Sequence, residues 1–351
     1  MRLTINDIAK RAGVSSTTVS RVINNKPDVD TKTRENILKI IEETNYVPNP
    51  IMIGLGKSKT NLVGFFTYNL VGPFRVEALR GISERLSSSQ YQLLFYNSNV
   101  PFPTTPEQYE RTSRGLFEII NKGSVDGLIM LQPVNDKTYL AELYQQGFPL
   151  VFIDDWGYMS QFDVPVVEVD NYNGALQAVR HLIGLGHQRI AIITGPLEVG
   201  SSAVRTSVDR LAGYKDALKE AGLPFDSALV AQGDFSEESG YSCITALLDR
   251  AETASGFTAL FASNDLMAIG AMNALNERGL KVPDDMSVVG FDDIPLDAYI
   301  RPALTTVRMP VKEMGKLAVE MLIEQIECKT LTAKKVLFPT ELIIRASTKP
   351  R

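Results

Sequence analysis

Most of the chain alternates short apolar runs with longer amphipathic stretches, and this alternation is the strongest constraint on its fold. From about residue 61 onward, the apolar runs indicate strands and the amphipathic stretches indicate helices. Repeated strand–helix alternation favours parallel sheets that are covered by helices on both faces. With this many strands, we expect an α/β body of two doubly wound lobes rather than one very large sheet. The expected strands are 62–67, 92–96, 127–131, 150–153, 166–169, 190–194, 229–232, 259–261 and 288–291, and the expected helices are 76–87, 112–121, 173–185, 211–221, 237–250, 265–278 and 311–327.

The composition limits the class of protein. Of 351 residues, 44% are hydrophobic and 22% are charged, which is ordinary for a folded globular protein. Two cysteines and two histidines supply neither a disulfide framework nor a soft tetrahedral metal site, so we expect no metal and no cofactor. The chain has no apolar run of about 18 residues, and its N-terminus lacks the pattern of a secretory signal. These features predict a cytoplasmic protein with no membrane partner.

The first fifty residues show a different pattern, that of three short helices. Thr4 and Asp7 form a capping box that opens a helix ending at Ala12, and Gly13 allows the turn that follows. Further helices are expected over about 15–24 and about 31–44. Helix, glycine turn and short helix make the helix-turn-helix pattern, in which the second helix enters the DNA major groove. Apolar residues at helical spacing form its expected core: Ile5, Ile8, Ala9, Ala12, Val19, Val22, Ile23, Ile37, Ile40 and Ile41.

Charge is distributed unevenly along the chain. Residues 1–60 contain ten lysines and arginines against six acids, a net charge of +4, whereas the whole chain carries −5 and the remainder therefore −9. A basic segment attached to an acidic body favours contact between that segment and a polyanion such as DNA. A difference of four charges also arises by chance, so charge alone does not decide the question.

The outward face of the second helix supplies the expected DNA contacts, which are Ser16, Thr17, Ser20 and Arg21. Small side chains let the groove floor approach, arginine can donate two hydrogen bonds to guanine, and serine or threonine can reach base edges or phosphates. The alternative interpretation is a three-helix cap whose polar face is merely solvated.

Enzyme motifs are missing from the sequence. Gly54-x-Gly56 and Gly184-x-Gly186 both lack the third glycine of a dinucleotide loop. No P-loop and no G-x-S-x-G serine motif occurs, and His181 and His187 do not have the spacing of a zinc protease. The sequence therefore predicts a binding protein and not an enzyme.

Polar side chains follow several expected strands, at the ends where parallel α/β sheets bind ligands. Asp154, Asn264 and Asp292 each follow an apolar run, and Arg210 precedes the expected helix 211–221. Carboxylates accept hydrogen bonds from the paired hydroxyls of a sugar, and arginine donates to them. The cleft between the two lobes is therefore the expected ligand site.

Each of these residues also has a purely structural interpretation. Asp265 is expected to cap the helix that begins there, and Asn264 is as good a cap as it is a ligand contact. Asp154 is typical of a turn, and Arg210 is typical of a surface arginine in an ion pair. An aromatic ring that packs on the C–H face of a sugar can come from Phe235 or Trp156.

The N-terminal signature resembles that of the lactose-repressor (LacI/GalR) family of transcriptional regulators. The stretch TINDIAKRAGVS at 4–15 and the stretch TVSRVIN at 18–24 carry this resemblance, and YVPNP at 46–50 resembles the entry into the family's hinge. The resemblance continues along the whole chain. It implies a DNA-binding headpiece at 1–47, with Thr4 and Asn24 among its DNA contacts, a hinge at 48–60, and a body at 61–351 that binds an effector and dimerises.

In this family, a hinge leucine inserts into the minor groove at the centre of the operator, and Leu55 matches it. Gly54 and Gly56 flank Leu55, and each costs a helix about 0.5–1 kcal/mol relative to alanine. We therefore expect a hinge that is poorly helical off DNA and becomes ordered on binding. For the body, the resemblance implies chain crossings near 161, 292 and 325, with an N-lobe at 61–161 and 293–324 and a C-lobe at 162–292 and 325–345.

The resemblance also assigns the effector contacts. Arg210, Asn264, Asp292 and Asp154 match the family's ligand-contacting positions, and Phe235 matches its stacking aromatic residue. Tyr68, Phe74 and Arg75 lie where the N-lobe meets the ligand. A further hypothesis gives the effector a phosphate or carboxylate that is held by Arg75 or Arg205, because a helix N-terminus already favours anions.

Together these observations predict a repressor that binds a palindromic double-stranded DNA operator as a homodimer and is controlled by a small carbohydrate effector. The alternatives are a periplasmic-type solute-binding protein without a DNA role and a sugar-modifying enzyme. The sequence leaves open whether the effector loosens or tightens DNA binding.

Overall fold

A computed structural model describes residues 5–23, 26–44, 59–67, 72–97, 115–120, 123–131, 137–154, 162–197, 204–250, 256–328 and 334–351. Within these ranges, no helix combines the length and the apolarity that a membrane span requires.

The helical headpiece consists of α1 (Ile5–Ala12), α2 (Ser16–Ile23) and α3 (Thr31–Glu43). Its buried core contains Ile8, Ala9, Val19, Val22 and Ile37, all of which the helical spacing predicts. Gly13 has a φ of +68°, which confirms the expected turn after α1. The Ser15 hydroxyl accepts a hydrogen bond from the Thr18 amide at 3.1 Å, so Ser15 caps α2.

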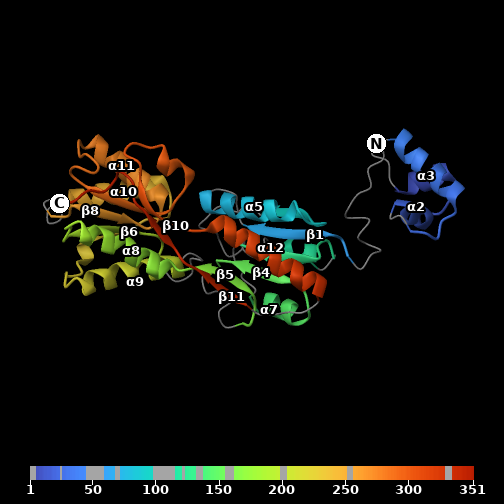
Figure 1. Ribbon diagram of the computed structural model, residues 1–351, viewed down its shortest axis with the longest axis horizontal. Helices are drawn as coiled ribbons and strands as arrows, with labels where there is room; N and C mark the ends of the chain where they lie inside the picture. Colours follow the sequence, from blue (N-terminus) through green and yellow to red (C-terminus); the bar gives the residue numbers. More distant parts are fainter. Residues whose placement is uncertain are drawn as a thin grey trace. The chain divides into compact units, whose positions relative to one another are not determined.

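The first sheet of the body has the strand order β11-β5-β4-β3-β1-β2. Helices α5 (Pro73–Leu86) and α12 (Val311–Cys328) pack against each other and lie along this sheet, as Figure 1 shows. A further helix, α7 (Lys137–Gln145), precedes β4. The strands are β1 (Leu62–Thr67), β2 (Gln92–Asn97), β3 (Gly127–Met130), β4 (Leu150–Ile153), β5 (Val166–Val169) and β11 (Lys335–Phe338).

The second sheet has the order β12-β10-β9-β8-β6-β7. Helices α8 (Asn171–Gly184) and α9 (Val204–Glu220) cover one face, and α10 (Glu237–Asp249) and α11 (Asp265–Glu277) cover the other (Figure 1). The strands are β6 (Ile190–Thr194), β7 (Val230–Gln232), β8 (Ala259–Ala262), β9 (Ser287–Asp292), β10 (Thr305–Arg308) and β12 (Glu341–Ile343), of which β12 runs antiparallel to β10. Short 3₁₀ turns, η1 (Ser227–Leu229) and η2 (Pro295–Ala298), lie between them.

The nine strands predicted from sequence are all present, with ends within one residue of those expected. The two parallel sheets confirm the predicted fold class. Strands β10, β11 and β12 were not expected, because they are short and polar or alternating rather than continuously apolar. Helix α9 begins at Val204 instead of 211, so Arg210 lies inside the helix and not before it.

The chain passes between the sheets at different points from those that the resemblance implied. It leaves the first sheet after β5, returns between β10 and α12, and leaves again between β11 and β12. The crossings thus lie near 170, 309 and 339 instead of 161, 292 and 325. The expected boundaries were wrong because β5 pairs with β4 and β11, and β10 pairs with β9, and these pairings are not visible in a local pattern.

Candidate functional site

Arg210 on α9 is the centre of a buried polar cluster. Its side chain is almost wholly buried, with 3% exposed. The guanidinium Nε donates to Asn171 Oδ1 at 2.9 Å, and Nη1 donates to the Ser263 carbonyl. The same group lies 3.7 Å from the centroid of the Phe291 ring. Arg210 is therefore not the surface arginine of the alternative interpretation.

Two acids from different sheets contribute their charge to this cluster. Asp292, at the end of β9, has Oδ1 3.8 Å from Arg210 Nη1, and 16% of its side chain is exposed. Asp154 follows β4 of the first sheet and acts electrostatically on both Arg210 and Asp292. Burial raises the pKa of Asp292, with Asp265 and Asp154 acting in the same direction and Arg210 opposing them. Burial likewise lowers the pKa of Arg210, which nonetheless stays cationic because a guanidinium is so basic.

The predicted residues at the strand ends share an unusual backbone. Asp154, Phe235, Asp292 and Asp293 all have positive φ, of +50°, +71°, +127° and +61°. Such conformations are uncommon for residues other than glycine, and they concentrate at binding sites. The chain therefore turns sharply at these residues, which lie at or soon after strand ends, the edge at which parallel α/β sheets generally bind ligands.

Asn264 has the capping role, contrary to the expectation for Asp265. Asn264 Oδ1 accepts from the Met267 amide at 2.9 Å, and its Nδ2 donates to the Phe235 carbonyl at 3.0 Å. Asn264 therefore caps α11 and fixes the Phe235 loop at the same time. Asp265 is instead the first residue of α11 and points into the protein, because residues following β9 offer it hydrogen-bond donors.

The N-lobe candidates are only partly described. Phe74 and Arg75 lie in the first turn of α5, and both are half-buried. Phe74 packs against the large apolar core, and burial lowers the pKa of Arg75. Arg205 on α9 lies 3.5 Å from Asp209 and is half-exposed. Five residues singled out from the sequence lie outside the described residues: Thr4, Asn24, Leu55, Tyr68 and Trp156.

A cavity of about 320 Å³ lies where the chain first passes between the sheets. Asp154 from the first sheet and Thr206 and Asp209 from α9 are among its lining residues. Asn171 also lines it and was not predicted, although its position directly after the β5 strand and the Asp170 helix cap was a usable signal. Because Asn171 accepts from Arg210, it connects the cavity with the buried cluster.

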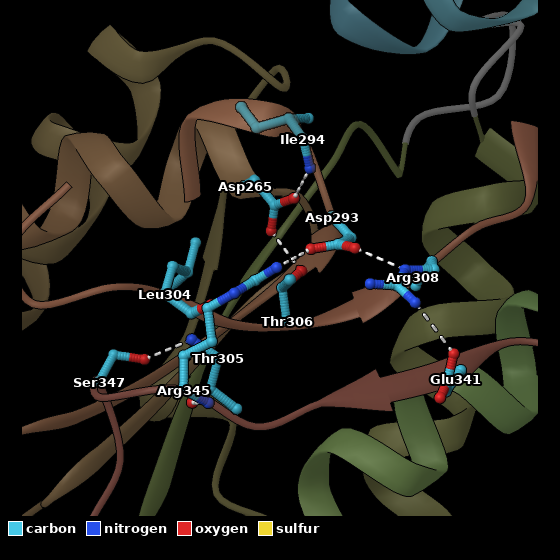
Figure 2. Close-up of polar contacts among 10 residues, drawn as sticks. All are labelled: Asp265, Asp293, Ile294, Leu304, Thr305, Thr306, Arg308, Glu341, Arg345 and Ser347. Carbon is cyan, nitrogen blue, oxygen red and sulfur yellow. Dashed lines mark hydrogen bonds and ion pairs between the residues drawn. The ribbon is translucent and has the colours of Figure 1, made fainter. Parts of the chain in front are cut away.

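A second set of ion pairs holds the loop after β9. Asp293 pairs with Arg345 at 2.5 Å and with Arg308 at 2.6 Å, and Arg308 also reaches Glu341 at 3.2 Å (Figure 2). Arg308 and Glu341 stand next to the second and third crossings of the chain. The loop that follows Asp292 is thus joined by ion pairs to residues beside the segments that connect the two sheets.

The DNA-facing candidates lie on α2. Thr17 and Arg21 are exposed, and Ser16 and Ser20 are half-buried. Arg21 Nη1 lies 3.3 Å from Asp28 Oδ2, and roughly half of each side chain is exposed. An exposed pair of this kind contributes only about 0–1 kcal/mol, so it leaves Arg21 available to another partner.

Comparison with known proteins identifies the family. Residues 4–49 match the model for bacterial regulatory proteins of the lacI family, and residues 179–348 match that for a periplasmic binding protein-like domain. The chain is 34% identical to the HTH-type transcriptional regulator DegA of Bacillus subtilis strain 168, over 100% of this chain and 99% of that protein. The chain belongs to the LacI family. Its relatives in this family are transcriptional regulators with a helix-turn-helix, and this LacI-family chain is likewise a DNA-binding transcriptional regulator.

Solved structures agree with this LacI-family assignment. The lac repressor dimer bound to operator and the anti-inducer ONPF matches with a TM-score of 0.79 and 29% identity, over 99% of this chain and 100% of that chain. The complex of the transcriptional regulator CelR with cellobiose matches with a TM-score of 0.70 and 32% identity, over 99% and 100% of the two chains.

Proposed function

We propose that this LacI-family regulator is a repressor whose affinity for its operator is controlled by a small, neutral, carbohydrate-like effector bound beside Arg210. The observation that carries the proposal is the buried Arg210 guanidinium, which joins Asn171, at the first crossing, to Asp292, at the end of β9. A ligand that contacts this cluster acts on the two sheets at once. Such a ligand is bound and released chemically unchanged.

The charges of the cluster favour hydroxyl groups over an anion. Arg210 faces the two carboxylates of Asp154 and Asp292, which leaves an excess of hydrogen-bond acceptors. Ser263 Oγ and Thr206 Oγ1 are buried without a hydrogen-bond partner among the described residues. Unpartnered buried hydroxyls are costly unless a ligand or water completes them. A sugar provides both the donors and the acceptors that these groups lack.

Coupling to DNA follows from the crossings. If the ligand favours one arrangement of the two sheets, it shifts the population toward that arrangement. The shift reaches the hinge at 48–60, which joins the body to the headpiece. A tenfold change in operator affinity requires about 1.4 kcal/mol of coupling free energy.

The test measures operator binding and effector binding on the same protein. Operator sequences selected from random DNA are titrated by fluorescence anisotropy, with and without sugars that raise the melting temperature, cellobiose and ribose among those screened. We expect one sugar to change operator affinity by about tenfold or more. Identical affinity with and without every stabilising sugar would contradict the proposal and leave a regulator that does not respond to carbohydrate.

The same screen separates neutral from anionic effectors. Each stabilising sugar is compared with its phosphate on the wild type and on Arg75→Ala. A neutral effector predicts that Arg75→Ala leaves the preference between the two unchanged. A phosphate preference that disappears in Arg75→Ala would instead support the anionic hypothesis. Turnover of the sugar would support the enzyme alternative, and sugar binding without any DNA affinity would support the solute-binding alternative.

The regulator is further proposed to act as a homodimer on a palindromic operator in the cytoplasm. The related lac repressor structure is a dimer on its operator. One headpiece of this size buries too little surface for tight specific binding. The body exposes two large apolar side chains at η2, namely Leu296, which is 49% exposed, and its C-cap Tyr299, which is 76% exposed. Exposed apolar groups of this size are typical of interfaces.

Tyr299→Asp is expected to weaken self-association by at least about tenfold, because a carboxylate would replace an aromatic ring at the interface. Sedimentation velocity over a range of concentrations measures this change. Phe225→Asp is the matched control. Phe225 is also an exposed aromatic residue, but it lies beside Lys215 and Tyr214 of α9 and not at η2, so its substitution should leave self-association unchanged. Equal dimerisation of the wild type and Tyr299→Asp would place the interface elsewhere.

A further inference from the structure

Two buried carboxyl groups, those of Asp265 and Asp297, lie beside the segment that follows Asp292. Asp265 opens α11 and Asp297 lies in η2, and both residues have no exposed surface. The two carboxyl groups are close enough to share a hydrogen bond. Two ionised carboxylates cannot occupy such a place together, because burial and mutual repulsion both disfavour the charged forms. The pair must therefore hold a proton or be neutralised by a cation.

The hydrogen bonds around Asp265 suit a carboxylate. Asp265 Oδ1 accepts from the Thr306 hydroxyl at 2.5 Å, and Oδ2 accepts from the Ile294 amide at 3.1 Å (Figure 2). A Cβ on Gly290 would lie 2.2 Å from Asp265 Oδ1. The Asp265 carboxylate can therefore pack against the sheet only because residue 290 has no side chain. Asp265 of α11 is thus joined by hydrogen bonds to β10 and to the segment that follows β9.

Asp297 has the opposite surroundings. Among the described residues, neither of its carboxyl oxygens has a hydrogen-bond donor. A buried carboxylate without donors is strongly disfavoured, whereas a protonated acid can donate to a neighbour. The neighbour within reach is Asp265, which has acceptor capacity left. The proton of the pair therefore belongs on Asp297.

The cationic side chains around the pair already have other partners, so they do not neutralise a second carboxylate in place of the proton. Arg345 acts on Asp297 from the segment after β12, but its guanidinium is already bound to Asp293 and to the Leu304 carbonyl. Arg308 of β10 forms its ion pairs with Asp293 and Glu341. Arg210 of α9 donates its hydrogen bonds within its own buried polar cluster. Asp292 and Asp293 at the end of β9 add negative charge. In the part of the chain that is described, no three metal-ligating side chains converge, which disfavours a bound metal ion.

We propose that Asp297 is a neutral carboxylic acid at physiological pH, that its O–H group donates a hydrogen bond to Asp265, and that this hydrogen bond positions the Asp292–Ile294 segment. Asp297 is a positioning residue, acting through Asp265 and the Ile294 amide. The protonation of Asp297 does not depend on what the protein binds. The consequence for effector affinity rests on the proposed function, since Asp292 is the residue that would touch the effector.

The electrostatics agree with this geometry. Burial and the adjacent Asp265 raise the pKa of Asp297 to about 10. In the unfolded chain, an aspartate titrates near pH 3.9. Between these two values the folded protein binds one proton more than the unfolded chain, so the free energy of unfolding falls as pH rises. Asparagine in place of Asp297 keeps the shape and the hydrogen bond to Asp265 but removes the titration.

The experiment compares the full-length wild type with Asp297→Asn and Asp297→Ala by thermal denaturation, from about pH 5 to about pH 9. The melting temperature of Asp297→Asn should exceed that of the wild type by an amount that grows steadily with pH. Asp297→Ala should show the same flat pH dependence at a lower melting temperature. Asp249→Asn is the control: Asp249 is exposed and paired with Arg278 at 2.6 Å, so its removal should cause no pH-dependent difference in this range.

Hydrogen–deuterium exchange of the peptide that contains Ile294 tests the positioning role. Exchange should be faster in Asp297→Ala and unchanged in Asp297→Asn, because asparagine can still donate to Asp265. Parallel pH dependence in the wild type and Asp297→Asn would show that Asp297 is not protonated and would overturn the proposal. Stabilisation of the wild type, but not of Asp297→Asn, by sodium or magnesium would also overturn it, in favour of a cation. Neither measurement uses DNA or sugar, so failure here leaves the repressor proposal untouched.

Discussion

Arg210→Ala is expected to abolish the response of operator binding to sugar and to lower the free energy of unfolding by about 3–5 kcal/mol. The loss is large because the buried Asp154 and the largely buried Asp292, with 16% of its side chain exposed, would be left without the cation that faces them. The hydrogen bonds to Asn171 and Ser263 disappear at the same time. Operator binding by anisotropy and unfolding in urea measure the two effects.

The pH dependence of this effect has a definite sign. Arg210 lowers the pKa of Asp292, so removing Arg210 raises it further. The folded variant then holds a proton that the unfolded chain releases. Its stability deficit should therefore shrink as pH falls and Asp292 becomes neutral.

Two further variants distinguish loss of the effector site from loss of folding. Asp292→Asn preserves the shape of the site and should fold even if Arg210→Ala does not, yet it should lose the sugar response. Arg180→Ala is the matched arginine control, because Arg180 pairs with Glu220 at 2.8 Å on the exposed surface and should cost no more than about 1 kcal/mol. A full sugar response in Arg210→Ala would show that the effector site lies elsewhere.

Arg21→Ala is expected to weaken specific operator binding by about 1–3 kcal/mol, or roughly 5- to 150-fold, and to relax the preference for one base pair. The reason is that Arg21 is the exposed basic side chain on the outward face of α2. Anisotropy titrations with the selected operator and with single-base variants measure both effects.

The controls for Arg21 separate base contact from charge. Lys10→Ala removes one positive charge from α1 and should weaken all DNA sequences alike, with a shallower salt dependence. Asp28→Asn frees Arg21 from its exposed ion pair and should leave the base preference intact. Unchanged base preference in Arg21→Ala would mean that another face of the headpiece reads the operator.

The sequence predicted the elements of the fold well, because each is encoded by a local period. The headpiece core of Ile8, Val19 and Ile37 follows from helical spacing alone. The nine apolar strands follow from short apolar runs that are bounded by turns. Strands such as β11, with alternating half-buried and exposed residues, carry too weak a local signal to be recognised.

The candidate site was predicted in part. Asp154, Arg210, Asn264 and Asp292 were named from their positions in the chain, and the structure places them at strand ends or in α9. Asn171 was missed because its role depends on Arg210, which lies 39 residues further along the chain. Capping was expected of Asp265 and was one of two roles considered for Asn264; Asn264 performs it and Asp265 does not.

Local sequence thus determined the headpiece, the strand–helix alternation and the family to which the chain belongs, since all three are written in short, contiguous patterns. Only the tertiary structure decided which sheet receives β5, β10 and β11, and hence where the chain crosses between the sheets. Only the tertiary structure, likewise, shows that Asp297 lies beside Asp265 and that Arg345 pairs with Asp293. These contacts join residues that are distant in sequence, and their energies depend on burial and on neighbouring charges that no local pattern contains.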